Sequence, residues 1–500
     1  MEHTKTALIL YPNQLFSPEL LPKADVILVV EEPLYFGADE QKPIDLHKQK
    51  LVLHRASMRR YIEEVLWQHD LNVEYVELDD INSTADILVR AQKTGAELVM
   101  IFDPTDHLIE SRLKKALDET VDTPFELKVL PNPSFMLKRS EVRDFFSSKT
   151  KHRFSDFYQW QRERFNILID KNYKPAGGQW AYELPKQQVL PEGQAAPGFD
   201  AFGDNKYVND AKKWVDKNFT GNPGSYDNFF WPTTHQEAIS WLNDFVQHRF
   251  GYFRSFSRTL DSQAVMMYHS GISACLNNGL LTPKQVLDIL FAAQPKHPVA
   301  IEELETFIRQ IIGWREYVRG LYVTQNVSDK GMGASATRAL HPKWWDGTTE
   351  IPPLDDVIKK VQLHAYAFDA ERLNLVANLM LLCDIHPREV YNWFCSLFID
   401  AYDWVVSPNV FGAMQLSDLG GIWPDPYISG SGEILSISRY QKDTWCDTWD
   451  GLYWSFLERH KAALSANPHT HHLLNELNSV SPEHRRIAAY RAQDFIASIS

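Results

Sequence analysis

The segment HSGISACLNNGLLTP (269–283) places small residues and hydroxyl groups where a turn would enter a helix. Ser270, Gly271 and Ser273 can present backbone N–H groups and hydroxyls to a phosphate at the start of that helix. An ordinary capped helix start has the same composition. Taken alone, the pattern favours that structural interpretation.

A buried arginine is the second feature with chemical potential. HAYAFDAERLNLVANLMLL (364–382) predicts an apolar helix bearing Arg372 and Asn378, and the apolar segment 398–409 carries Asp400 and Asp403. A buried guanidinium needs a carboxylate partner, and Asp400 is the natural one. Beside a ring cofactor, such a pair would stabilise negative charge developing on the ring. The alternative is a purely structural salt bridge in the core.

GWREYVRG (313–320) predicts a helix on which Arg315 and Arg319 are neighbours one turn apart. Their like charges repel unless a carboxylate or phosphate lies between them. A solvated charged face is the alternative, but the apolar residues around this segment argue against it.

The four cysteines contain neither a close pair nor a CxxC motif, which excludes a disulfide framework and a zinc site of the usual spacing. We expect them to be buried packing residues in a reducing cytoplasm. His386, directly before Pro387, is typical of a helix start and is not expected to bind metal.

The elements that position these residues fall into three parts. Residues 1–135 alternate short apolar runs with helical patterns, the clearest at 47–71, which predicts a doubly wound α/β unit with a parallel sheet. No GxGxxG follows the first run, so a standard dinucleotide site is not indicated. The five predicted strands are TALILYPN, DVILVVEE, NVEYVEL, ELVMIFDP and ELKVLPN.

In such sheets a ligand sits beyond the carboxyl ends of the strands. Those ends, 11–16 and 31–36, offer polar and aromatic groups together. Residues 136–235 are rich in Gly, Pro and aromatics in their later part and predict a surface connector with little regular structure. Residues 236–500 predict an all-helical domain, with Pro283 and Pro387 at helix starts.

The composition is that of a globular protein and argues against membrane-spanning and strongly basic, nucleic-acid-coating classes. Hydrophobic residues make up 44% and charged residues 23% of 500 residues, as in globular proteins with a sizeable core. No apolar run is long enough to span a bilayer, and the N-terminus predicts a strand in place of a signal peptide. The net charge of −14 argues against diffuse nucleic-acid binding, so any contact with DNA needs a local basic patch. Aromatic residues, at 12%, suit both a core and stacking on a planar cofactor.

Together these segments resemble the photolyase–cryptochrome superfamily. The chain is most similar to its bacterial deoxyribodipyrimidine photolyase-related branch, which includes (6-4) photolyases with an iron–sulfur cluster. The resemblance covers nearly the whole chain, and its motifs are KPAGGQW (174–180), FFWPTTH (229–235), LNNGLLTP (276–283), GWREYVRG (313–320), DAYDWVVSPNVFG (400–412) and DGLYWSFLERH (450–460).

The resemblance implies an N-terminal antenna domain, which in this branch can hold a lumazine, and a helical domain that binds FAD. It also implies electron transfer from light-excited reduced flavin to a UV lesion in DNA. The matching residues are Asn13, Gln14 and Glu32 for the antenna, Ser270, Gly271 and Ser273 for the phosphates, Arg372 and Asp400 beside the flavin ring, Asn378, Asp403 and Val406 around it, and Trp393 and Trp345 in the photoreducing relay. Phe394 stands where a redox-active tyrosine is usual.

The chain departs from the family at the iron–sulfur cluster. The cluster-bearing relatives have three closely spaced cysteines where RYQKDTWCDTWDGLYW (439–454) keeps only Cys446, and their fourth falls near Pro353. One thiolate cannot hold a four-iron cluster, so no cluster is expected. We expect a compact loop in which Trp445, Trp449 and Trp454 fill the space.

The second departure concerns catalysis. Relatives that repair (6-4) lesions carry two histidines where this chain has Phe368 and Asp369. Phe cannot act as a general acid. Asp369 would need a raised pKa to donate a proton, and His364, one helical turn away, is a possible substitute.

Two functions therefore remain open. The first is a photolyase acting on (6-4) or cyclobutane lesions in UV-damaged DNA, supported by the family match and by basic segments at 54–60 and 137–153. The second is a cryptochrome-like photoreceptor that photoreduces its flavin and signals through a partner, favoured by Phe368 and Asp369. A redox flavoprotein without light chemistry is weaker, because of the two relay tryptophans. We expect a cytoplasmic monomer.

Overall fold

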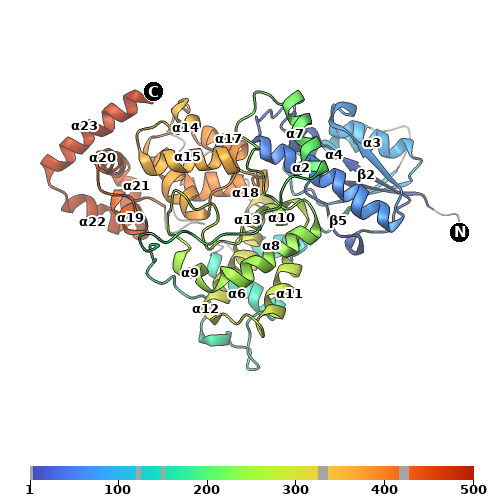
Figure 1. The fold of residues 1–500 in the computed structure, drawn as a ribbon, viewed down its shortest axis with the longest axis horizontal. Helices are drawn as coiled ribbons and strands as arrows, with labels where there is room; N and C mark the ends of the chain where they lie inside the picture. The colour runs from blue at the N-terminus through green and yellow to red at the C-terminus, as the bar shows by residue number, and fades with distance from the viewer. Residues whose placement is uncertain (1–3, 120–124, 148–152, 325–335, 416–426, 500) are drawn as a thin grey trace.

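The N-terminal part is a parallel five-stranded sheet (Figure 1). The computed structural model describes residues 4–119, 125–147, 153–324, 336–415 and 427–499. All five predicted strands are present, in the order β3-β2-β1-β4-β5, with β1 in the centre and Ile9 aligned with Leu28 and Ile101. The strands are β1 (Thr6–Leu10), β2 (Val26–Val30), β3 (Val73–Val76), β4 (Leu98–Phe102) and β5 (Glu126–Leu130).

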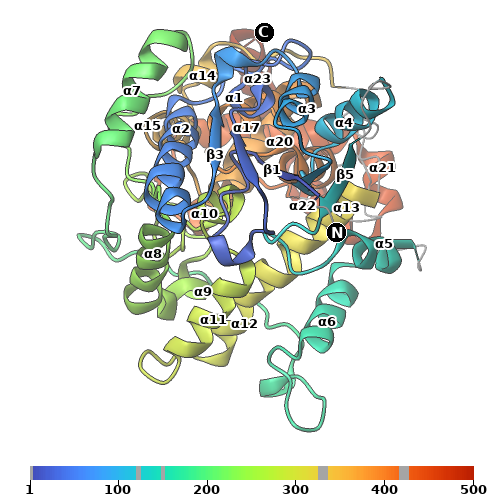
Figure 2. The same ribbon diagram turned by 90° about the vertical axis from the view of Figure 1, so that its right-hand side faces the viewer.

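Helices cover both faces of this sheet (Figure 2). The central strands are fully buried because β1 and β2 carry apolar residues on both faces, as parallel strands between helix layers require. The helices of this part are α1 (Pro33–Phe36), α2 (Lys48–Tyr61), α3 (Thr84–Lys93) and α4 (His107–Glu119).

The connector is more regular than its sequence predicts. It contains α5 (Arg139–Ser147), within the stretch 137–154 whose sequence is compatible with a helix, and also α6 (Phe154–Phe165) and α7 (Lys206–Asn218). Helix α7 packs along α2, and α5 packs on the helical domain. These helices gain their stability from tertiary packing of apolar faces, which a single-sequence pattern weakened by Gly and Pro does not reveal. Residues 166–205 remain mostly irregular, as predicted.

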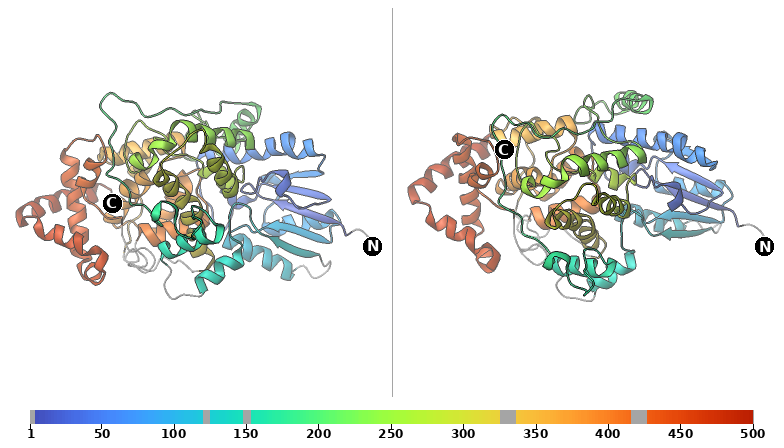
Figure 3. Two further views of the ribbon diagram at one scale, coloured as in Figure 1. Left: turned by 90° about the horizontal axis from the view of Figure 1, so that it is seen from below. Right: turned by 60° about the horizontal axis from the view of Figure 1, so that its bottom comes forward.

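In the C-terminal part, the regular elements of the described residues are all helices (Figure 3). Pro283 and Pro387 begin helices as predicted, and the ring of His386 accepts a hydrogen bond from the Arg388 amide as an N-cap. None of the described helices is both long and apolar enough to cross a membrane. The helices are α8 (His235–His248), α9 (Phe253–Phe256), α10 (Ser273–Asn278), α11 (Pro283–Ala293), α12 (Ile301–Ile308), α13 (Arg315–Thr324), α14 (Lys343–Asp346), α15 (Pro352–His364), α16 (Asn378–Leu382), α17 (Pro387–Leu397), α18 (Asp403–Ser407), α19 (Ser431–Ser436), α20 (Thr444–Arg459), α21 (Lys461–Ala466), α22 (His471–Ser479) and α23 (Pro482–Ser498).

The end of the molecule farthest from the sheet is formed by α20 to α23 (Figure 1). Helix α20 contains the three tryptophans that the sequence was expected to place in a loop. Trp445 and Trp449 pack edge to face, with ring centroids 6.0 Å apart, and Cys446 is buried beside them. The segment is helical because α20 packs its apolar residues against α23. The prediction of a loop at this position is therefore wrong, whereas the prediction that apolar side chains pack there is confirmed.

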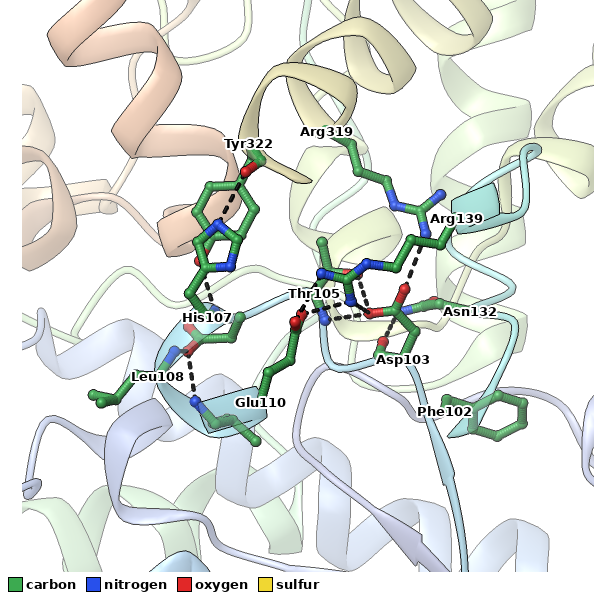
Figure 4. A network of polar contacts seen from close by, with 12 residues as sticks. Phe102, Asp103, Thr105, His107, Leu108, Glu110, Asn132, Arg139, Arg319 and Tyr322 are labelled. Carbon is green, nitrogen blue, oxygen red and sulfur yellow. Dashed lines mark hydrogen bonds and ion pairs between the residues drawn. The ribbon is translucent and has the colours of Figure 1, made fainter. Parts of the chain in front are cut away.

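Polar contacts join the sheet to the helical domain (Figure 4). Asp103, directly after β4, accepts hydrogen bonds from Arg139 and from Arg319 of α13, each at 3.2 Å. Arg319 also donates to the carbonyl of Leu137 at 2.8 Å. A carboxylate thus pairs with Arg319, and Arg315 donates to the carbonyl of Ser134 at 3.1 Å as well as to the side chain of Asn277 in α10 at 2.5 Å. Both arginines of GWREYVRG therefore serve the domain interface.

The basic segment at 54–60 is also engaged within the protein. Arg55 pairs with Glu31 at 2.7 Å, Arg59 with Glu77 at 2.6 Å, and Arg60 with Glu237 at 2.5 Å. These guanidinium groups are committed to carboxylates, so the segment does not form the local basic patch that its sequence suggests. In the second basic segment, residues 148–152 lie outside the described residues.

Candidate functional site

Arg372 and Asp400 form the predicted ion pair. Two guanidinium nitrogens of Arg372 donate to the two carboxylate oxygens of Asp400, each at 3.0 Å. The third donor, Nε, bonds the carbonyl of Ala367 at 2.6 Å, and the guanidinium lies over the Phe398 ring, 4.2 Å from its centroid. Burial alone would raise the pKa of Asp400, but the charge and hydrogen bonds of Arg372 hold that pKa below its ordinary value.

The Ser–Gly turn lies directly against this pair. The Ser273 hydroxyl donates to Asp400 at 2.6 Å, so it is part of the ion-pair network. Gly271 has φ +64°, a left-handed conformation that favours glycine, and a Cβ there would lie 2.7 Å from the sulfur of Met266. Helix α10 begins at Ser273 with no side-chain cap, which leaves its first amide groups without intrahelical acceptors. The carbonyl of Ser270, two residues before the cap residue, accepts a hydrogen bond from the indole of Trp241 at 2.6 Å.

Phe368, where relatives carry a histidine, packs on a histidine from another segment. The rings of Phe368 and His269 stack, with centroids 4.7 Å apart and planes 14° apart. His269 is buried, and its Nε2 has no hydrogen-bond partner. Burial, and then the charge of Arg249, lowers the pKa of His269 to about 3, so the ring is neutral.

Arg249 supplies a second set of unused donors near His269. Its side chain is fully buried and pairs with Asp244 at 2.9 Å. The Nε and a terminal nitrogen of this guanidinium have no acceptor. Sequence reasoning missed His269 and Arg249, although His269 begins the HSGIS motif. A ligand that offers hydrogen-bonding groups would satisfy these atoms.

The two substitute proton donors do not lie on one helix, contrary to the sequence-based expectation. Helix α15 ends at His364, because Ala365 adopts left-handed φ +54° and turns the chain away. Burial, and then Lys360, lowers the pKa of His364 to about 4. The Asp369 side chain reaches the surface, yet the loss of hydration among the surrounding atoms, with a smaller effect of the Asp400 charge, raises the pKa of its carboxyl above the ordinary value against the opposing charge of Arg372. That direction is the one a proton donor needs.

Asn378 and Val406 occupy the interior near this region. The amide of Asn378 donates to the carbonyl and hydroxyl of Ser429, both at 3.1 Å, so these hydrogen bonds hold the segment at 429. Val406 is buried in α18 and offers only an apolar surface.

Asp403 belongs to a different cluster from Asp400. It pairs with Lys42 at 3.1 Å and accepts hydrogen bonds from Tyr322 at 2.6 Å and from Tyr391. Asp403 also raises the pKa of the neighbouring Asp106, which burial and this charge bring to about 6. Lys42 and Asp106 come from the sheet part, so this carboxylate joins the two parts of the molecule.

Of the proposed relay tryptophans, Trp393 is fully buried and Trp345 partly so. The indole N–H of Trp393 donates to the carbonyl of Trp344 at 3.0 Å, which places α17 against α14. Phe394 stacks on Phe398, the ring that underlies the Arg372 guanidinium. An aromatic path therefore joins the Trp393 segment to the ion pair.

Polar groups gather at the carboxyl ends of β1 and β2, as expected. Glu32 is fully buried and one of its oxygens has no partner, and the same holds for the hydroxyl of Tyr11 and the amide oxygen of Asn13. Gln14 is different, because its amide bonds the Tyr11 amide and the Phe102 carbonyl. Three unpartnered oxygens in one buried region favour a ligand that carries hydrogen-bond donors.

The titration of Glu32 is measurable. Burial raises its pKa from 4.5 to about 7, against a smaller opposing effect of Arg112. A raised carboxyl pKa means that stability is lost as the pH rises from the unfolded value through the folded one. Glu32→Gln should therefore stabilise the protein at pH 8 by up to about 3 kcal/mol, and by much less at pH 5. Urea unfolding at both pH values tests this, with Glu77→Gln as the control that should give no stabilisation.

The described residues contain no group of three or more His, Cys, Asp or Glu side chains arranged to hold a metal ion. Cys275, Cys383, Cys395 and Cys446 are each buried and unpaired, as their spacing predicts.

Comparisons with known proteins agree with this architecture. The sequence model of the deoxyribodipyrimidine photo-lyase-related protein family matches residues 8–231. The chain is 26% identical over 448 residues to a (6-4) photolyase of Agrobacterium fabrum, covering 84% of this chain and 85% of that protein. It is also 30% identical over 198 residues to an uncharacterized protein of Acanthamoeba polyphaga mimivirus, covering 37% of this chain and 96% of that protein.

Two solved structures share the fold over the whole chain. A bacterial class III photolyase from Agrobacterium tumefaciens superposes with a TM-score of 0.58 at 14% identity, covering 100% of this chain and 98% of that one. A Synechocystis cryptochrome gives a TM-score of 0.57 at 14% identity and covers 100% of both chains. Residues 8–231 therefore belong to the deoxyribodipyrimidine photolyase-related family, and the whole chain, with its parallel sheet and helical domain, has the fold of photolyases and cryptochromes.

Proposed function

We propose that the protein is a blue-light-driven, FAD-dependent enzyme that reverses UV pyrimidine lesions in DNA. The observation that carries this proposal is the bidentate pair of Arg372 and Asp400, held by Ser273 beside the Ser–Gly turn. A buried pair of this kind is costly to build, and it lies next to unused hydrogen-bonding atoms of His269 and Arg249. The relationship to a (6-4) photolyase supplies the substrate class.

The described residues fit a flavin dinucleotide in their chemistry. The uncapped start of α10 and the Arg249 guanidinium offer donors to phosphate oxygens, and Arg372 offers positive charge to an electron-rich ring. When bound and reduced, the flavin would supply the electron that reverses the lesion after it absorbs light. Asp400 would hold Arg372 in place, and Trp393 would pass electrons toward the site.

We place the antenna chromophore of this proposal at the carboxyl ends of β1 and β2. The unpartnered oxygens of Tyr11, Asn13 and Glu32 would accept hydrogen bonds from a lumazine-type chromophore. The proposal predicts a heterocycle with N–H or hydroxyl donors, because all three free atoms belong to groups that can accept.

A photoreceptor function is the second candidate, and Phe368 favours it. Phe368 stacks on His269 and has no proton to give. In this alternative the protein would photoreduce its flavin and signal through a partner, and Asp369 would serve only as a surface carboxylate.

Repair of defined lesions decides between these functions. Oligonucleotides carrying one (6-4) lesion or one cyclobutane dimer are incubated with the reduced protein under blue light. We expect one lesion to be reversed, because its nucleotide can flip out of the duplex into the site. Asp369→Asn should slow repair by roughly a hundredfold, the effect of losing a general acid, while affinity for damaged DNA changes little. Photoreduction without repair of either lesion would favour the photoreceptor.

The purified protein should be yellow, with one non-covalent FAD for each chain. We also propose that it holds no iron–sulfur cluster, since the buried Cys446 has no second cysteine beside it in the sequence. Iron analysis should give far less iron than a four-iron cluster needs. Cys446→Ala should keep both the fold and the flavin absorption, and loss of visible absorption together with iron would contradict this.

A further inference from the structure

A tyrosine and a histidine form a buried hydrogen-bonded pair between the two parts of the molecule. The Tyr402 hydroxyl lies 2.9 Å from Nε2 of His54 in α2. The other ring nitrogen, Nδ1, lies 3.0 Å from the carbonyl oxygen of Tyr35. His54 is 1% and Tyr402 is 7% exposed, so water does not compete for these bonds.

The contacts of His54 fix the direction of both hydrogen bonds. A carbonyl can only accept, so Nδ1 carries the proton and donates to Tyr35. Burial, and then the charge of Lys50, lowers the pKa of His54 to about 3, so the ring is neutral and Nε2 is a free lone pair. Tyr402 therefore donates its phenolic proton to a base.

The pair lies next to the ion pair of the candidate flavin site. Tyr402 follows Asp400 by two residues, and the chain between them is held by Lys50, which donates to the Ala401 carbonyl and lies 4.8 Å from the centre of the Tyr402 ring. On the other side, the rings of Tyr402 and Tyr35 are 5.9 Å apart, and Asn13 donates to the Tyr35 hydroxyl at 3.2 Å. The pair thus lies between the candidate flavin and antenna sites.

We propose that Tyr402 and His54 are a redox pair, in which Tyr402 gives one electron to an oxidant at the Arg372–Asp400 site and its proton to His54. The oxidant is a light-excited oxidised flavin, so this inference rests on the proposed function. The Tyr402 O–H bond breaks, an Nε2–H bond forms, and a neutral tyrosyl radical and an imidazolium remain. The flavin gains the electron, and the reverse transfer restores both residues.

His54 is what distinguishes Tyr402 from other buried tyrosines. Loss of an electron makes a phenol strongly acidic, so the radical lasts only where a base takes the proton. Tyr61, also in α2 and 2% exposed, donates to the carbonyl of Phe16, which cannot take a proton. The Tyr402 hydroxyl, by contrast, donates to an imidazole nitrogen, which can take the proton. The nearby Lys50 opposes the imidazolium, which favours return of the proton.

The resting state of the pair can be tested without flavin. In protein labelled with ¹⁵N-histidine, NMR should show His54 protonated at Nδ1 and free at Nε2, with the signals assigned through His54→Gln. Tyr402→Phe should shift the Nε2 resonance and leave Nδ1 protonated. A proton on Nε2, or an Nε2 signal that ignores Tyr402→Phe, would overturn the proposal.

The redox step is tested by a blue flash on the protein with oxidised FAD, followed by electron paramagnetic resonance. We expect a tyrosyl radical that is lost in Tyr402→Phe and in His54→Gln, kept in Tyr61→Phe, and formed more slowly in D₂O. If the protein binds no flavin, the proposed function is refuted, but the redox pair can still be tested. The same flash is then given with a soluble ruthenium photo-oxidant in place of the flavin. A radical that survives Tyr402→Phe, or radicals on tryptophan only, would refute the redox pair.

Discussion

Arg372→Ala should destabilise the protein by about 3–5 kcal/mol, because it leaves the Asp400 carboxylate buried without its partner. Asp400 would keep the hydrogen bond from Ser273, which cannot replace two charged donors. The same variant should lose affinity for FAD. Urea unfolding and flavin titration measure the two effects separately.

The matched control is Arg459→Ala. Arg459 pairs with Asp384 at 2.8 Å, but its side chain is 46% exposed, so the loss should be about 0–1 kcal/mol. Equal losses in the two variants would show that the Arg372–Asp400 pair has no special role in stability.

The stability of Arg372→Ala should change with pH in the opposite direction to that of the wild type. In the wild type the lowered pKa of Asp400 contributes stability above the unfolded pKa, and this contribution is lost as the pH falls through the folded value. Without Arg372, burial remains and raises that pKa, so the variant loses stability as the pH rises. The two proteins should therefore differ most at neutral pH and converge toward acid.

Trp393→Phe should strongly slow photoreduction of the flavin, leaving only what Tyr402 can supply, while repair by chemically reduced enzyme survives. Phe keeps the ring packing but is much harder to oxidise than an indole. It also leaves the Trp344 carbonyl without its donor, which costs about 1–3 kcal/mol. Absorption changes under blue light with an added reductant measure photoreduction, and lesion reversal after dithionite reduction measures repair.

Trp445→Phe is the control for this variant. Trp445 is 5% exposed, and its indole donates to the Gln441 carbonyl at 3.2 Å, so the packing and hydrogen-bond losses are similar. It lies in α20, away from the proposed relay. Photoreduction should be unchanged, and an equal loss in both variants would point to destabilisation in place of electron transfer.

Local sequence patterns were enough to predict the sheet and the Arg372–Asp400 ion pair. The three inner strands, β1, β2 and β4, are apolar runs bounded by polar residues, and this local pattern is sufficient because both sheet faces are covered by helices. Arg372 and Asp400 could be paired because a buried charge must find an opposite one, and Asp400 lies on a neighbouring apolar segment. Helix starts could be predicted equally well, as the helices that begin at Pro283 and after His386 show.

Which polar groups already have partners, and which remain without one, depends on contacts between segments far apart in the chain. Arg319 and Asp403, like Arg372 and Asp400, are charged residues within apolar segments. Their partners, however, come from the sheet part, far away in the chain: Arg319 pairs with Asp103, and Asp403 pairs with Lys42. Likewise His269 meets Phe368, and His54 meets Tyr402, across long sequence separations. Hydrophobic periodicity specifies which face is buried but not which residue it meets, because that contact is set by packing between elements.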